Sequence, residues 1–183
     1  MQGLSRDTIS REQNFLKTKK SNEIEDYIVE QFGVKALRPI CDVDRPLTAD
    51  EVKDLSLQPF VEIGNHTHTH AILTNYSTAA AKEEMLQAQD NLEKITGTRP
   101  LSVAYPNGNY SDGIVAAAKD VGFKMGITTL ESKNYLPLKN NDLFCLKRFT
   151  LWGNGCFAGE CDRTRSDFHL KSSLKELLGK VGN

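Results

Sequence analysis

The chain has 183 residues, which is long enough for one domain with a hydrophobic core. Hydrophobic residues make up 39% and charged residues 26%, a composition that argues against intrinsic disorder. The formal net charge of −1 gives no electrostatic reason to bind nucleic acid or an anionic membrane. No apolar run reaches the roughly 18 residues of a membrane span. The polar start shows no signal peptide, so we expect a cytoplasmic protein.

The first third of the chain predicts two helices and one strand. The segment before Ser21 is polar, and we expect it to be loosely held. Ser21 can cap a helix that runs to Phe32, and Gly33 can end it. The stretch Thr48-Ala-Asp-Glu51 matches a capping box and predicts a short helix. Residues 60–63 then predict a strand.

The clearest helix begins near Ser77 or Thr78 and ends before Gly97. Apolar residues at helical spacing mark its buried face, namely Met85, Ala88, Leu92 and Ile95.

The rest of the chain continues the alternation of strands and helices. Such alternation indicates a parallel sheet covered by helices, in which chemistry gathers at the carboxyl ends of the strands. Residues 64–70 and 106–112 occupy that position. The remaining predicted strands are 101–105, 124–129 and 144–152, and the remaining predicted helices are 112–121 and 167–178.

The cysteines form no C-x-x-C pair, so we expect four ordinary thiols. A disulfide between Cys156 and Cys161 and a four-cysteine metal site, which would include Cys41 and Cys145, are the alternatives.

Three of the four histidines lie within residues 66–70, directly after the predicted strand. In a helical turn, His66 and His70 would point to one side and could share a metal ion. In an extended strand, His68 would join them on one face. Gly64-Asn65 favours a strand that ends there, and so favours the pair. The alternative is a polar loop whose histidines are solvated or hydrogen-bonded.

Two histidines do not complete a catalytic zinc site, which usually takes three protein ligands and a water. A carboxylate is the natural third ligand. Asp42, Asp44, Glu62 and Asp112 are candidates that spacing does not separate.

At these residues the sequence resembles the NodB-type polysaccharide deacetylases of carbohydrate esterase family four. Residues 61–70 are similar to the family's His-Ser/Thr-x-x-His metal motif, and residues 103–108 to its groove-wall motif, in the Ala-Tyr-Pro version. The resemblance runs from about Arg45 to Trp152. Further matching positions are Leu73, Ser77, Glu83-Glu84, Gly122-Phe123, residues 127–129 and Arg148.

The resemblance implies a deformed (β/α) barrel that removes acetyl groups from N-acetylated sugars or polysaccharides. We expect residues 1–183 to form a single domain of this type, incomplete on its N-terminal side. The family's metal ligands carry over to His66 and His70, with zinc as the expected ion. Thr67 takes the hydroxyl position that orients the loop by hydrogen bonding.

The resemblance also implies a groove beside the metal. The backbone N–H of Asn107 would help to hold the oxyanion, and Tyr105 and Pro106 would line the groove.

The sequence departs from the family pattern at the catalytic carboxylates. The family opens with a strand ending in Asp-Asp, and this chain contains no such pair. Asp42-Val-Asp44 comes too late in the element order to replace it. The family's late catalytic histidine is also not found, because the only late histidine, His169, falls within an amphipathic helix. In addition, Ala104 replaces the arginine of the Arg-x-Pro version of the groove-wall motif. General base and general acid are therefore not identified.

These departures leave several hypotheses open. The chain is either part of a deacetylase whose first strands are missing or a diverged, inactive relative. The first predicts an exposed edge beside residues 60–63, which a homo-oligomer could cover. The second predicts a carbohydrate-binding or interaction module of the same fold. A metal-free α/β domain is the third possibility.

Overall fold

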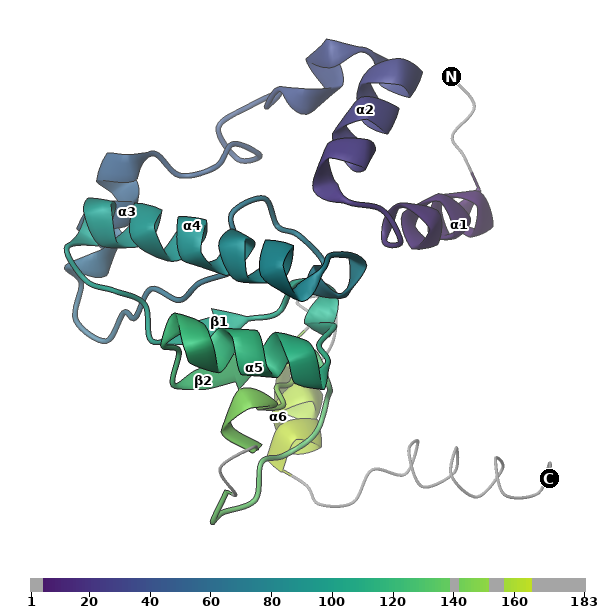
Figure 1. Cartoon of the computed structure of the whole chain (residues 1–183). Helices are drawn as coiled ribbons and strands as arrows, with labels where there is room; N and C mark the ends of the chain where they lie inside the picture. Colours follow the sequence, from purple (N-terminus) through teal and green to yellow (C-terminus); the bar gives the residue numbers. More distant parts are fainter. Residues whose placement is uncertain (1–4, 139–141, 152–156, 166–183) are drawn as a thin grey trace, which may run out of the picture.

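The computed structural model describes residues 5–138, 142–151 and 157–165 (Figure 1). Two helices at the N-terminal end lie beside a body made of a small sheet and the helices that cover it. The predicted helix over 167–178, with His169, lies outside the described residues, as does Cys156.

The polar N-terminal segment forms a helix, contrary to the expectation of a loosely held stretch. Helix α1 (Arg6–Leu16) begins at Ser5, whose hydroxyl accepts a hydrogen bond from the Thr8 N–H. Helix α2 (Ser21–Phe32) has the predicted bounds and ends at Gly33, with φ 79°. Its N-cap is Lys20 and not Ser21, because the Ser21 side chain bonds to another part of the chain.

The two N-terminal helices are joined by a small aromatic contact. The rings of Phe15 and Tyr27 meet edge to face at 6.2 Å, and the Tyr27 hydroxyl donates to Glu12. A single 3₁₀ turn, Val34–Leu37, follows α2.

Helix α3 (Ala49–Ser56) confirms the predicted capping box, with reciprocal bonds between Thr48 and Glu51. The strand predicted over 60–63 is wrong. Phe60 has φ 67°, and its side chain is fully exposed. In the described part of the chain, residues 60–65 form only one bridge, between Asn65 and Val103. A strand needs partners to satisfy its backbone, and the described segments offer one only at Asn65.

The sheet is parallel, as predicted, and small. Strand β1 (Ser102–Ala104) pairs with strand β2 (Met125–Ile127), with Val103 opposite Gly126. Parallel bridges extend it on both sides, from Asn65 to Val103 and from Ile127 to Leu146. Of the strand predicted over 144–152, the described residues form only the bridge at Leu146. A 3₁₀ turn, Asp142–Phe144, precedes it.

Helices α4 (Thr78–Thr96) and α5 (Asp112–Val121) connect the parallel segments and run side by side in Figure 1. Helix α4 has the predicted cap at Ser77, and α5 has a serine cap that the sequence analysis did not name. Ser77 and Ser111 accept bonds from the first turns, and Gly97 and Gly122 end the helices with left-handed backbones. On the predicted buried face of α4, Met85 and Ala88 are buried, whereas Leu92 and Ile95 are partly exposed. A helix that the sequence did not predict, α6 (Phe157–Arg165), lies near the C-terminal end of the described chain.

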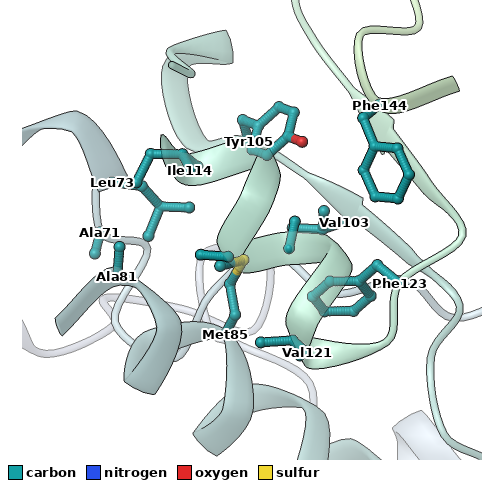
Figure 2. Close-up of a cluster of buried hydrophobic side chains, with 12 residues drawn as sticks. Ala71, Leu73, Ala81, Met85, Val103, Tyr105, Ile114, Val121, Phe123 and Phe144 are labelled. Carbon is teal, nitrogen blue, oxygen red and sulfur yellow. The ribbon is translucent and has the colours of Figure 1, made fainter. Parts of the chain in front are cut away.

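The hydrophobic core lies between α4, α5 and the sheet (Figure 2). Gly126 faces this core, because an added Cβ would stand 2.6 Å from the Phe144 carbonyl oxygen and 2.8 Å from the Tyr105 ring. The core side chains are Ala71, Leu73, Ala81, Met85, Val103, Tyr105, Ile114, Ala117, Ala118, Val121, Phe123 and Phe144.

Candidate functional site

The loop that carries the histidines is fixed by Asn65, which is 1% exposed. Its backbone bonds to β1 through Ser102 and Ala104, at 2.9 Å each. Its side-chain amide donates to the carbonyl of Met85 on α4 at 2.9 Å, and its carbonyl oxygen accepts from the Thr67 N–H at 2.8 Å. One buried side chain therefore ties the sheet, α4 and the loop together.

The rings of His66 and His70 meet at this loop, with centroids 4.8 Å apart and planes at 70°. The loop is not helical, contrary to the predicted turn. Instead, Thr67 and His70 adopt left-handed backbones, with φ of 67° and 56°.

The hydrogen bonding of His66 and the burial of His70 decide how the pair can bind a metal ion. His66 Nδ1 lies 2.6 Å from the Ala104 carbonyl oxygen. Because a carbonyl only accepts, Nδ1 donates, and Nε2 of the neutral ring keeps its lone pair. Burial, followed by the electrostatic effect of the neighbouring His66 ring, lowers the pKa of His70. Neutral imidazole is the form that binds metal ions.

His68 does not join the pair, so the three-histidine face of an extended strand is not formed. Its backbone N–H donates to the Glu84 carboxylate at 3.1 Å, and its ring Nδ1 lies 3.5 Å from the Asn91 amide. Glu84 also accepts bonds from the N–H and hydroxyl of Thr69, both at 2.9 Å. This carboxylate therefore fixes the loop from the side of α4.

Thr67 does not orient the loop through its hydroxyl. The oxygen is buried, and it finds no hydrogen-bond partner among the described residues. Asn65 performs that role instead. The sequence held a signal for it, because an asparagine directly after Gly64 can bond to the backbone two residues on.

Asn107 lies in a tight turn, Pro106–Gly108, after β1. Its backbone is left-handed, with φ 57°, and its carbonyl accepts a bond from the Thr129 hydroxyl at 3.3 Å. Gly108 is required here because it has φ 76° and an added Cβ would stand 2.7 Å from the Thr129 nitrogen.

Tyr105 and Pro106 are buried in the core, so neither forms an open groove wall. The Tyr105 ring stacks on Tyr110 at 5.7 Å, and burial raises the pKa of its hydroxyl. That hydroxyl has no hydrogen-bond partner in the described part of the chain.

A cavity of about 230 Å³ connects the site to the N-terminal helices. His70 and Asn107 both contribute to its lining, so the predicted metal ligand and the predicted oxyanion donor border the same cavity. The sequence did not indicate the other side of this cavity, because nothing in the polar N-terminal segment predicted a contact with the histidine loop. The remaining lining residues are Leu16, Lys17, Lys19, Ser21, Ile24 and Ile72.

The described residues do not complete a metal site. In the ranges 5–138, 142–151 and 157–165, no three His, Cys, Asp or Glu side chains gather closely enough to hold an ion. Asp44 accepts bonds from the N–H groups of Ile40 and Cys41, which lower its pKa, and Asp42 pairs with Arg45 at 3.5 Å. The two imidazoles fit a metal ion, but a third ligand is not among these residues.

The described cysteines are free thiols, as expected for Cys41, Cys145 and Cys161. The proposed partner of Cys161 in a disulfide, Cys156, lies outside the described residues. Within the described ranges, no helix is long and apolar enough to cross a bilayer.

Comparison with known proteins identifies the family. The sequence model of polysaccharide deacetylases matches residues 15–126. A peptidoglycan-N-acetylmuramic acid deacetylase of Bacillus subtilis, PdaC, is 38% identical over 58 residues, which are 32% of this chain and 12% of that protein.

Solved structures of deacetylases share the fold. The Streptococcus pyogenes deacetylase PplD, in complex with acetate, is 27% identical with a TM-score of 0.55, over 62% of this chain and 48% of that one. A Bacillus cereus polysaccharide deacetylase is 24% identical with a TM-score of 0.53, over 69% of this chain and 42% of that one. The chain thus spans less than half the length of these relatives. The likeness confirms the NodB-type fold class, here seen as helices with a small parallel sheet.

Proposed function

Because the chain belongs to the polysaccharide deacetylase family, we propose that it contributes the histidine side of a hydrolase site that removes N-acetyl groups from a carbohydrate. One observation carries the proposal. The His66 and His70 rings meet at 4.8 Å, at the end of a parallel segment, and His70 shares a cavity with Asn107.

His66 and His70 would hold a divalent metal ion, with zinc preferred by imidazole ligands. When bound, such an ion polarises an amide carbonyl and lowers the pKa of a coordinated water. His66 is oriented for this by its bond to Ala104, the kind of support that metal-binding histidines usually have.

The reaction is the hydrolysis of an acetamide. A water oxygen bonds to the acetyl carbon, the C–N bond breaks, and the sugar amine leaves with a proton, so that acetate and a free amino sugar result. The backbone N–H of Asn107 would donate to the oxygen that gains charge. The reaction also needs a general base and a general acid, which are not identified among the described residues.

The third ligand is proposed to be a carboxylate on a segment that pairs beside Asn65. Two findings support this. The described chain has no partner on that side of Asn65, and it spans less than half the length of its structural relatives. In this account the chain is part of a larger deacetylase and is weakly active by itself.

Metal binding by the full chain tests the proposal directly. Zinc affinity is measured for the wild type, for the His66→Ala, His70→Ala double variant and for His68→Ala. His68 is the matched control because it lies in the same loop but not in the pair. We expect binding in the wild type and the control, and its loss in the double variant. Equal binding in all three would refute the proposal.

Activity is tested on acetylated chitooligosaccharides by acetate release. Extending the chain with the in-frame codons upstream of Met1 should raise the rate strongly if they encode a strand that ends in aspartate. An active, extended protein whose rate does not depend on His66 would contradict the assignment of the site.

A second candidate is a carbohydrate-binding module that kept the fold without the chemistry. The absence of a third ligand among the described residues favours it. It predicts glycan binding that survives both chelation and His66→Ala. Binding that requires zinc would exclude it.

A further inference from the structure

The junction between α1 and α2 is fixed against the loop that follows the histidines. The Asn75 side-chain amide donates to the carbonyls of Lys17 and Lys19, both at 2.9 Å. The Ser21 N–H donates to the Tyr76 hydroxyl at 2.7 Å. The junction therefore forms one side of the half-open cavity of about 230 Å³ that borders the candidate site.

The polar side chains on the wall of this cavity bond to groups that do not line it. The Ser21 hydroxyl donates to a backbone carbonyl of the histidine loop at 3.2 Å. The Lys19 ammonium lies 4.9 Å from the centre of the Phe15 ring, which is outside the lining. The Asn107 side-chain amide donates to the Asn109 side chain at 2.9 Å. These bonds leave few polar side-chain groups for a ligand.

Aliphatic side chains from three segments supply the apolar surface of the cavity, namely Leu16, Ile24 and Ile72. Lys17 also contributes to the lining, but this residue is exposed to solvent. A sugar ring suits such a wall poorly, because its hydroxyls would lose bonds to water without gaining partners. An alkyl chain suits it well, because it needs no hydrogen bonds.

The size of the cavity exceeds what an acetyl group needs. An aliphatic cavity of roughly 150 Å³ is already large enough to bind benzene. The single methyl of an acetyl group would leave most of the 230 Å³ unfilled. A chain of several carbons would fill it and contact all three aliphatic segments.

We infer that this cavity receives the acyl chain of the substrate, and that the site accepts N-acyl groups longer than acetyl. The inference rests on the proposed function, in which His70 binds the metal ion and Asn107 donates to the amide oxygen. Because both residues border the cavity, an amide bound at them would extend its alkyl chain into it. The hydrolysis balances as for acetyl, since water adds to the acyl carbon, the C–N bond breaks, and a longer carboxylate and a free amine result.

A series of glucosamine derivatives tests the inference separately from the chemistry. The full chain is titrated with N-acetyl-, N-butanoyl- and N-hexanoylglucosamine in the presence of EDTA. A methylene group removed fully from water tightens binding about fourfold, and in a half-open cavity we expect about twofold. The hexanoyl derivative carries four more methylenes than the acetyl one, so it should bind about fifteenfold more tightly. Equal affinity across the series would overturn the inference.

Matched variants locate the effect on α2. Ile24→Trp fills the cavity and should remove the dependence on chain length. Val29→Trp is the control, because Val29 lies on the same helix but outside the lining, and it should keep the dependence. Unfolding midpoints show whether both variants fold, and the series with the wild type does not depend on them. The same loss in Val29→Trp would refute the assignment of the cavity.

Two further arms separate the explanations. Hexyl glucoside carries the same length of alkyl chain without an amide, and binding as tight as that of N-hexanoylglucosamine would show unspecific apolar binding and overturn the inference. A dependence on chain length in EDTA, together with no zinc binding by the wild type, would refute the proposed function while supporting the acyl cavity. Zinc binding without the dependence would do the opposite.

Discussion

Replacing Asn65 with alanine should destabilise the protein more than any other single change near the histidines. The variant loses two buried hydrogen bonds, to the Met85 carbonyl and from the Thr67 N–H. Each bond contributes about 1 kcal/mol net, and a buried N–H left without a partner costs about 1–3 kcal/mol. The Met85 carbonyl lies within α4 and keeps its helical bond, so the main penalty falls on Thr67. We expect a loss of about 3 kcal/mol in the free energy of unfolding.

The assay is equilibrium unfolding in urea, monitored by far-ultraviolet circular dichroism. A thermal melt is recorded for the same variants. For a chain of this size, a loss of about 3 kcal/mol corresponds to a fall in Tm of about 9 °C. Asn75→Ala is the matched control. It also removes two side-chain bonds to backbone carbonyls, but at a more accessible site where water replaces them, and we expect less than about 1 kcal/mol. A loss below about 1 kcal/mol for Asn65→Ala would refute the role given to this side chain.

Three further predictions follow from the core, a surface ion pair and a helix cap. Gly126→Ala should cost about 2 kcal/mol through overpacking against the Phe144 carbonyl and Tyr105, and Tyr105→Phe should relieve part of it in a double-mutant cycle read by urea unfolding. Arg45, paired with Glu51 at 2.7 Å, lowers the pKa of that carboxyl to about 2. A lowered folded-state pKa adds stability above the unfolded value near 4.5 that is lost as pH falls towards 2, so melts of Arg45→Gln should show a flatter pH dependence in that window. Ser77→Ala removes the cap of α4 and should cost about 1 kcal/mol in urea unfolding, and no measurable loss would contradict the capping bond.

The positions of α2, α3, α4 and α5 were predictable because their signals are local, whereas α1 and α6 were not predicted. The caps and the terminal glycines of α4 and α5 are read directly from neighbouring residues, and the bounds of α2 and α3 follow from the same chemistry. Strands were predicted less well. Residues 60–63 have the alternation of a strand but lack a partner among the described segments, and pairing is not a local property.

The histidine pair was predictable in identity but not in geometry. Spacing brought His66 and His70 together, although neither the helical nor the extended backbone describes the loop. The left-handed conformations at Thr67 and His70 depend on bonds made by Asn65 and Glu84 to distant parts of the chain. Likewise, the burial of Tyr105 depends on how α5 and residue Phe144 pack, which its motif did not indicate.

The sheet edge and the candidate site are one feature of this fold. Asn65 is the outermost residue that bridges to β1, and it is also the anchor of the histidine loop. Parallel strands present their carboxyl ends at the same edge of a sheet. A parallel strand that paired on the outer side of residues 60–65 would therefore end beside His66 and His70, where the third ligand is needed. The same added strand would cover the exposed Phe60 segment. Under the proposed function, completing the sheet and completing the metal site would require the same segment, so its addition should raise the free energy of unfolding and the zinc affinity together.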